Sequence, residues 1–269
     1  MSTPTPRPAS RHVRFDEPAG GLLVMTLDRP PVNALGRALV EDLDAACAWL
    51  ETLPPESAPR TVVLAASGKC FCAGADLKER QGMSADDVRR WVPFLSGTFT
   101  RIASLPMPTI AVVQGVAAGG GVELALACDL RVAEEPATLG LRETALAILP
   151  GAGGTQRLPR LIGPARAKRW IFTAAMHTAA AALADGAVDA VVPAGAGLAR
   201  AMEWARAIAS NGPVAVRLAK RAVEGGFDLP LAEALEHERR CYEGVLSTED
   251  RLEALKAFVE KRDPVFKGR

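Results

Sequence analysis

Hydrophobic residues recur with two different periods along the chain, and the change from one to the other predicts its organisation. Short runs rich in β-branched residues predict buried strands at 22–27, 61–66, 109–113 and 187–192. Apolar residues at helical spacing predict helices at 35–53, 85–105, 122–127, 163–173 and 179–183. From residue 198 onward only helical spacing remains, with helices expected at 198–210, 213–224, 231–246 and 249–261. The pattern is typical of an α/β protein with a helical C-terminal part.

The first long helix has a clear inward face and a candidate start. Leu39, Leu43 and Leu50 lie on one side of the predicted helix 35–53 and would pack against the strands. Asn33 precedes this helix. We expect it to be the N-cap, because an Asn side chain accepts hydrogen bonds from the free N–H groups of a first turn.

Three regions follow from this pattern. Residues 1–20 contain several prolines and are predicted to form a flexible arm, residues 21–197 the core, and residues 198–269 a C-terminal helical region. The apolar faces of the C-terminal helices need a surface that covers them. A second copy of the chain would supply one and make a homo-oligomer, although these helices could instead pack only on their own chain.

Composition narrows the classes of function. The 269 residues carry a formal net charge of +1, so bulk charge favours neither nucleic acid nor an anionic membrane as a partner. No apolar run approaches the roughly 20 residues that cross a bilayer. Five cysteines without regular spacing favour reduced thiols and a cytoplasmic protein. The three histidines (His12, His177 and His237) lack the spacing of metal ligands, so no metal site is predicted.

A glycine cluster after a buried strand is the strongest candidate for chemistry. The run 109–113 leads to Gly119, Gly120 and Gly121, after which a helix begins. Free N–H groups at a helix start, approached through glycine, stabilise developing negative charge on a ligand. Glu123 lies in the first turn among apolar neighbours. Its carboxylate either accepts hydrogen bonds from such N–H groups or transfers a proton.

A second acid and a second loop repeat this arrangement. Glu143 lies 20 residues further on and precedes an apolar segment that ends in the glycine loop 150–154. An earlier strand leads into Gly74 and Ala75, whose backbone could present another N–H group. The loops at Ala75 and Gly120 could therefore bind one oxyanion together.

Each acid also has an ordinary structural explanation. Glu123 alone fits an acid that caps a helix, and Glu143 alone fits a solvated side chain beside Arg142. The loop 150–154 lacks the Gly-Lys-Ser/Thr ending of a nucleotide-binding P-loop. Two acids that both lie near glycine-rich backbone favour an active site.

Four segments carry a resemblance to a known family. They are CAGADLKE at 72–79, QGVAAGGGVELALACDLRVA at 114–133, GLRETALAILPGAGGTQRLPRLIG at 140–163 and AFVEKRDPVFKG at 257–268. Together they resemble the crotonase, or enoyl-CoA hydratase/isomerase, superfamily. The resemblance implies a crotonase-type spiral of ββα units and a C-terminal helical trimerisation region, and it implies a trimer or a dimer of trimers.

The same resemblance implies roles for the candidate residues. The N–H groups of Ala75 and Gly120 match the oxyanion hole that binds the thioester carbonyl of an acyl-CoA. Glu123 and Glu143 match the two catalytic glutamates of the hydratases. As a hypothesis, Glu123 deprotonates a water that adds to the double bond, and protonated Glu143 delivers a proton to C2. Coenzyme A is part of the substrate, so no separate cofactor is implied.

The resemblance extends to positions that contact coenzyme A. They are Pro31, Val32, Ala34, Ala73, Gly74, Asp76, Leu77, Lys78, Gly119, Tyr242 and Lys261. Lys261 is suited to a phosphate. A packed tyrosine and a solvated lysine are the ordinary alternatives for the last two.

Two segments carry a finer resemblance: ETALAILPGAGGTQRLPRLIGPARAKRWIFTA at 143–174 and CYEGVLSTEDRLEALKAFVEKR at 241–262. Within the superfamily they look most like the 3-methylglutaconyl-CoA hydratases, which implies interconversion of 3-methylglutaconyl-CoA and 3-hydroxy-3-methylglutaryl-CoA. A distal carboxylate on the acyl group calls for a nearby cation, and Lys78, Arg80 and Arg157 are candidates. The alternative within the same chemistry is a general short-chain enoyl-CoA hydratase.

An alternative of another class is binding to AU-rich RNA. Arg89, Arg90 and Arg101 on a predicted helix would supply basic surface, together with the arginines of the arm. Aromatic residues make up only 5% of the chain, and acids are interleaved with the bases. Nucleic acid is therefore the weaker prediction.

Overall fold

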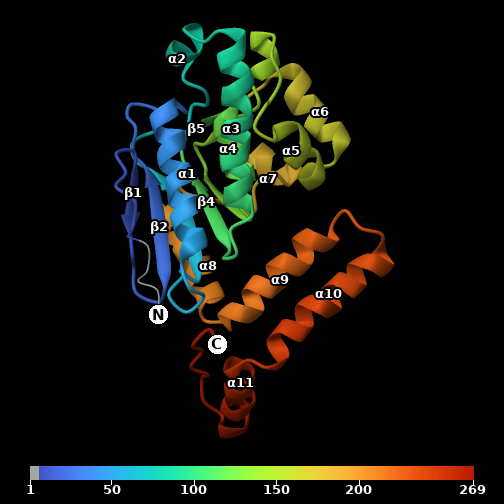
Figure 1. Ribbon diagram of the computed structural model, residues 1–269. Coiled ribbons are helices and arrows are strands. Elements are labelled where there is room, and N and C mark those ends of the chain that lie inside the picture. The colour runs from blue at the N-terminus through green and yellow to red at the C-terminus, as the bar shows by residue number, and fades with distance from the viewer. Residues whose placement is uncertain (1–5) are drawn as a thin grey trace.

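The computed structural model describes residues 6–269, which form a central six-stranded sheet with helices on both faces (Figure 1). The strand order is β1-β2-β3-β4-β6-β9, parallel throughout except that β1 is antiparallel to β2. The strands are β1 (Val13–Asp16), β2 (Leu22–Leu27), β3 (Thr61–Ala66), β4 (Thr109–Val113), β6 (Leu130–Glu134) and β9 (Ala190–Val192). The predicted α/β class and the first three predicted strands are confirmed, and the fourth is shorter than predicted.

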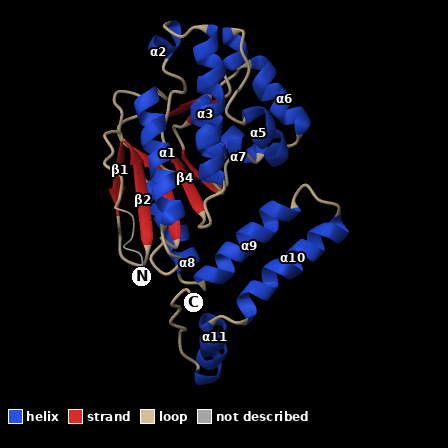
Figure 2. Cartoon of the chain, in the orientation of Figure 1, coloured by secondary structure: helices blue, strands red, loops and turns tan. Residues whose placement is uncertain are grey.

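The strands are apolar at nearly every position because both faces of the sheet are buried. On β2, Leu23 and Met25 join the cluster that includes α1 (Arg37–Thr52) and α3 (Ala85–Ala103). Leu22 and Val24 point the other way, into the cluster under α8 (Gly197–Ala209). Figure 2 shows the resulting layers of helix, sheet and helix.

Helix α8 was predicted to belong to the C-terminal helical region, and the structure places it on the core instead. Ala201, Met202 and Ala205 are buried against the sheet, with small side chains that bring the helix close to the strands. Burial of this face makes α8 a layer of the α/β core.

A smaller sheet of order β5-β7-β8 lies beside the first and was not predicted. Its strands are β5 (Val116–Ala118), β7 (Thr138–Gly140) and β8 (His177–Thr178). Around it lie α2 (Leu77–Gln81), α4 (Gly120–Leu126), the 3-10 helix η1 (Glu143–Leu146), α5 (Gly154–Ile162), α6 (Pro164–Thr173) and α7 (Ala179–Asp185). Both candidate acids lie here, Glu123 in the first turn of α4 and Glu143 at the start of η1.

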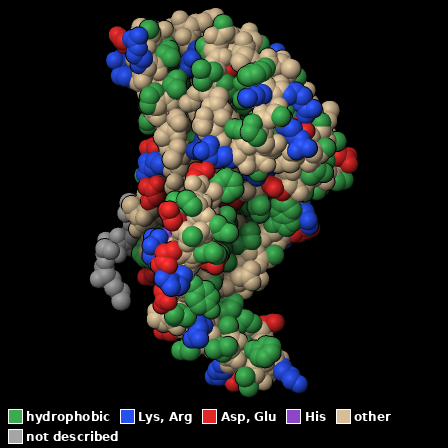
Figure 3. All heavy atoms as spheres, turned by 90° about the vertical axis from the view of Figure 1, so that its right-hand side faces the viewer, with side chains coloured by type: hydrophobic (Ala, Val, Ile, Leu, Met, Phe, Trp, Pro, Cys, Tyr) green, Lys and Arg blue, Asp and Glu red, His purple; other side chains and the backbone are tan. Residues whose placement is uncertain are grey.

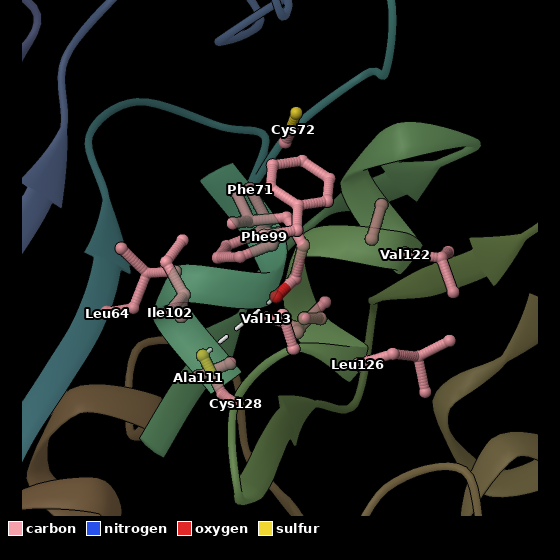
Figure 4. Close-up of a cluster of buried hydrophobic side chains, with 14 of the residues drawn as sticks. Leu64, Phe71, Cys72, Phe99, Ile102, Ala111, Val113, Val122, Leu126 and Cys128 are labelled. Atoms are coloured by element: carbon pink, nitrogen blue, oxygen red, sulfur yellow. Dashed lines mark hydrogen bonds between the residues drawn. The ribbon is translucent and has the colours of Figure 1, made fainter. Parts of the chain in front are cut away.

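Helix α4 is anchored in the hydrophobic core (Figure 4). Val122 and Leu126 project from it into the cluster that contains Phe71 and Phe99. The sulfur of Cys128, just beyond the helix, lies 3.9 Å from the Leu124 carbonyl oxygen. All seven residues of α4 are buried, so its first turn is held rigidly.

The remaining helices extend away from the core (Figure 1). Helices α9 (Pro213–Gly226) and α10 (Leu231–Leu246) pair as a hairpin, and α11 (Glu249–Glu260) follows. The Arg60 guanidinium ties the end of the chain to the core, because it donates to the Phe266 carbonyl oxygen at 2.6 Å and to that of Ala209, the last residue of α8, at 2.7 Å. Within residues 6–269, no helix has both the length and the apolar character of a membrane span.

Part of the predicted flexible arm is ordered structure. Residues 13–16 form β1 and pair with the part of β2 from Val24 to Leu27. Val13 is buried, and the Phe15 ring packs edge-on against Trp49 at 5.7 Å between centroids. Apolar burial thus holds residues whose proline-rich surroundings suggested a loose segment. Residues 1–5 of the predicted arm lie outside the described residues.

Asn33 does not cap a helix, contrary to the prediction. Helix α1 begins later, with Gly36 as its N-cap. The Asn33 side chain, 1% exposed, donates to the carbonyl oxygens of Ser67 at 3.0 Å and Cys70 at 2.9 Å, and its amide oxygen accepts from Arg29 N–H at 2.8 Å. Its φ of 50° lies in the left-handed region that Asn tolerates. Asn33 therefore pins one loop to another.

Replacing Asn33 by Ala is expected to lower the free energy of unfolding by about 2 kcal/mol, because two buried carbonyl groups lose their donors. Urea unfolding measures this change. Asn211→Ala is the matched control, since that amide is exposed and makes one hydrogen bond. Equal stabilities of the two variants would contradict the pinning role.

Candidate active site

Two segments that are far apart in the sequence form backbone hydrogen bonds with each other. The Cys72 N–H donates to the Val116 carbonyl at 3.1 Å, and the Ala118 N–H donates to the Cys72 carbonyl at 3.0 Å. Each of the two segments then continues into a turn that contains glycine. A Cβ built on Gly74 would lie only 3.4 Å from the Gly120 nitrogen, so the two turns are in contact.

The turns depend on glycine at two positions. Gly74 has a φ of +87° and Gly119 a φ of +53°, where a side chain is strained. A Cβ on Gly74 would lie 2.5 Å from the Ala118 carbonyl oxygen, and one on Gly119 would lie 2.9 Å from a Glu143 carboxylate oxygen. Space for the second acid therefore exists because residue 119 has no side chain.

The two predicted oxyanion donors are free of protein acceptors. The bridge between Leu35 and Ala75 uses the N–H groups of Leu35 and Asp76, so the Ala75 N–H points away from it. Gly120 N–H belongs to the first turn of α4, which has no intrahelical acceptor for it. Neither amide donates to any other residue in the range 6–269.

Glu123 is held by the glycine loop that follows η1. Its side chain is 2% exposed, and Oε1 accepts the N–H groups of Ala152 and Gly154, both at 2.8 Å. Burial raises the pKa of Glu123, while these two N–H groups and the Arg157 charge oppose the rise. Glu123 is thus buried with support for its anionic form.

Glu143 is buried without such support. It is 9% exposed, and its Oε2 has no hydrogen-bond partner within the described part of the chain. Burial, and secondly the Glu123 charge, raise the pKa of Glu143 to about 7. Of two neighbouring carboxyl groups, Glu143 is therefore the one that carries a proton near neutral pH.

This arrangement suits acid–base chemistry at an oxygen that becomes negative. One acid is stabilised as a base and the other as an acid, next to two free backbone donors. Both acids, Ala75 and Gly120 are thus brought together as the sequence predicted.

Comparison with known proteins identifies the family. The family model described as enoyl-CoA hydratase/isomerase matches residues 17–269. The chain belongs to the enoyl-CoA hydratase/isomerase family. The superfamily resemblance is thereby confirmed.

Relatives and solved structures agree with this assignment. Over 96% of this chain and 82% of the relative, the chain is 43% identical to the mitochondrial methylglutaconyl-CoA hydratase of Mus musculus. It is also 43% identical to an enoyl-CoA isomerase/hydratase of Mycosarcoma maydis, with 93% of each chain covered. The crystal structure of enoyl-CoA hydratase from Bacillus anthracis matches with a TM-score of 0.93 and 46% identity, covering 96% of this chain and 100% of that one. The crotonase fold is therefore confirmed.

Most of the predicted coenzyme A positions form one surface segment beside the two turns. The Ala73 N–H donates to the Val32 carbonyl at 3.0 Å and the Leu35 N–H to the Gly74 carbonyl at 2.8 Å, so the stretch 31–35 runs along 73–76. This surface includes Pro31, Val32, Ala34, Ala73, Leu77 and Lys78. The contact of this surface with coenzyme A stays a prediction.

Asp76 holds the backbone of this surface in place through hydrogen bonds. Its Oδ1 accepts the N–H groups of Lys78 and Glu79, which makes it the N-cap of α2, and its Oδ2 accepts from Arg29 at 2.7 Å. The Arg29 hydrogen bond is the main cause that lowers the pKa of Asp76. Sequence reasoning missed Arg29, although a cation beside a proline turn and an N-cap acid further along were visible.

Tyr242 and Lys261 are not brought to this surface within one chain. Tyr242 is 63% exposed on α10, and Lys261 follows α11 at the opposite end of the molecule from α2 (Figure 1). Lys261 has a φ of 52° and ends the helix as its C-cap. Their contact with coenzyme A stays a prediction that needs a second copy of the chain.

The unequal surroundings of the two acids predict an unusual titration. Glu143 is expected to titrate near pH 7, and in Glu123→Gln its pKa should fall toward the ordinary value of 4.5 without reaching it, because burial remains. Carbon-13 NMR of labelled glutamate carboxyl groups follows both titrations. Glu203→Gln, which removes an exposed acid, serves as the control. A midpoint unmoved by Glu123→Gln would show that the acids do not interact.

Proposed function

We propose that the protein is a hydro-lyase that adds water reversibly, with syn geometry, across the double bond of an α,β-unsaturated acyl-CoA. The observation that supports this most is the convergence of Glu123 and Glu143 on the Gly119–Gly120 turn with different hydrogen-bond support. A family member that only shifts a double bond or only polarises a thioester needs no such pair of acids.

The mechanism follows from the chemistry of a conjugated thioester. The N–H groups of Ala75 and Gly120 bind the thioester oxygen, and their hydrogen bonds strengthen as it gains negative charge. Each such donor lowers the barrier by roughly 3 kcal/mol. Polarisation of the carbonyl leaves C3 open to attack by water and makes C2 ready to accept a proton.

The two acids divide the proton transfers. Glu123, supported as an anion, orients the water and takes its proton as the oxygen adds to C3. Glu143, which holds its proton, delivers it to C2. Dehydration runs through the same groups with their roles exchanged.

For the acyl group we propose 3-methylglutaconyl-CoA, with 3-hydroxy-3-methylglutaryl-CoA as the hydrated product. Support comes from the methylglutaconyl-CoA hydratases among the relatives. Of the three candidate cations for a distal carboxylate, Arg157 is occupied by contacts to Ala152 and Thr100. Lys78 and Arg80 lie on α2, directly beyond the Ala75 amide.

A hydration assay tests both levels of this proposal. Glu123→Gln and Glu143→Gln are each expected to lower kcat by about 10²–10⁴-fold, because each removes one proton transfer. The exposed Glu135→Gln is the control. The kcat/KM for 3-methylglutaconyl-CoA should exceed that for crotonyl-CoA. A large preference for crotonyl-CoA would identify a general short-chain hydratase, and no hydration of either would overturn the function.

RNA binding gains no support from the arrangement of the basic residues. Arg89 and Arg90 pair with acids one turn earlier on α3, at 2.5 and 2.7 Å. Arg101 is bound by two acids of α1 at 2.9 and 2.6 Å. These cations are already neutralised and offer little to a phosphate backbone. The cytoplasmic location stays a prediction, since relatives include mitochondrial proteins.

We also propose that helices α9 to α11 form the interface of a homo-oligomer, a trimer or a dimer of trimers. Large hydrophobic side chains on them are strongly exposed, and Figure 3 shows how they gather on this part of the molecule. They include Val223, Phe227, Leu231, Leu255, Phe258 and Val259. Exposed apolar area on this scale is typical of an interface.

The assembly is tested by the mass of the protein in solution. The unchanged chain is expected to sediment as three or six copies, and Phe258→Asp combined with Val259→Asp as a smaller species, because charge in a dry interface is unfavourable. Glu260→Gln on the same helix is the control. A monomeric unchanged chain would show that these helices pack on their own chain alone.

A further inference from the structure

Arg157 places a positive charge near Glu123 and contacts the loop that holds this acid. It belongs to α5, and its half-buried guanidinium is held at two points. Nη1 donates to the Ala152 carbonyl oxygen at 2.9 Å, and Nη2 donates to the Thr100 hydroxyl of α3 at 3.2 Å. The side chain is therefore fixed in place by two different elements.

Ala152 links this guanidinium to the acid. Its N–H donates to Glu123 Oε1 at 2.8 Å, while its carbonyl accepts from Arg157. The next residue, Gly153, has a φ of +110°, and a Cβ there would collide with the guanidinium. The loop thus brings Arg157 close to Glu123 through a glycine that leaves room for it.

The charge of Arg157 has no other acid to balance it. Arg131, a buried arginine of the core, pairs with Asp189 at 3.2 Å. No carboxylate within residues 6–269 forms an ion pair with Arg157. In a half-buried position its field is screened weakly, so it acts on the nearest ionisable groups.

We propose that Arg157 is a positioning residue for the reaction: by its charge and its hold on Ala152 it keeps Glu123 anionic and oriented, so that the shared proton stays on Glu143. The inference rests on the proposed function, in which Glu123 is the base and Glu143 the acid. The hydrogen bonds of the Arg157 guanidinium go to Ala152 and Thr100, so its role acts through Glu123.

The charged groups that face the two acids are few. Glu123 is faced by Arg157 from α5 and by Glu143 from η1, and Glu143 is faced by Glu123 from α4. Without Arg157, mutual repulsion is the only charge–charge interaction left in this part of the described structure, and the Ala152 and Gly154 N–H groups alone support the Glu123 anion. Glu123 would then compete for the proton, and a larger share of molecules would carry this proton on Glu123 instead of on Glu143.

The pH dependence of kcat/KM tests this proposal. Its acid limb reports protonation of the base in the free enzyme. In Arg157→Gln the limb is expected to move up by about one pH unit, because an opposite charge close to a carboxylate lowers its pKa by at least that much. At a pH below the limb this is a tenfold fall in kcat/KM. Arg157→Lys, which keeps the charge, is expected to restore most of the position of the limb.

Two further variants separate charge from structure. Arg160→Gln, which removes an exposed cation from the same helix, should leave the limb in place. Thr100→Val removes one of the two contacts that hold the guanidinium, so the acid limb should move up by less than in Arg157→Gln. This variant tests the proposal even if Arg157→Gln does not fold. A limb unmoved in Arg157→Gln, or moved equally in Arg157→Lys, would overturn the proposal.

Carbon-13 titration of Glu123 gives a readout that needs no activity. In Arg157→Gln the Glu123 midpoint is expected to rise, and an unmoved midpoint would overturn the proposal. If the Glu123 midpoint rises in Arg157→Gln but the unchanged protein hydrates no enoyl-CoA, the electrostatic effect of Arg157 on Glu123 is supported. The proposed hydratase function is then overturned.

Discussion

The site depends on the close pairing of backbone at 69–75 with backbone at 114–121. Each segment offers a carbonyl and an N–H to the other segment, and the two approach so closely that side chains are excluded at several positions. A Cβ on Gly115 would collide with the Lys69 carbonyl, and one on Gly121 with the Cys72 carbonyl. Glycine is required here because two main chains occupy the space of a side chain. The pairing is what puts the two free amides beside each other.

Around this backbone the two acids differ in what surrounds them. Removing a carboxylate from water is costly, and hydrogen bonds or a cation must offset the cost if the group is to stay charged. Glu123 receives two N–H groups and lies near a guanidinium, whereas one oxygen of Glu143 has no partner in the described chain. The same burial therefore produces a base at one position and an acid at the other.

Several elements could not be read from local pattern. Strands β5, β7 and β8 contain three, three and two residues, which is too short for a period to emerge. Helix α5 contains Pro159 and starts in a glycine loop, so its sequence looks like a turn. Asn33 has the residue type of a cap, but its partners are the carbonyls of Ser67 and Cys70, which only the folded chain brings near. Such elements owe their conformation to tertiary contacts.

The sequence alone determined the α/β class, the long strands and helices and, through its motifs, the two acids and the two amides of the candidate site. It could do so because long apolar periods and glycine-flanked acids are local features. Only the tertiary structure decided that α8 belongs to the core, that residues 13–16 pair with the sheet, and that Arg157 and Glu123 both bind Ala152. Those outcomes depend on which distant surfaces meet, and on how far each charge lies from the next, and neither property is written in the spacing of residues along one chain.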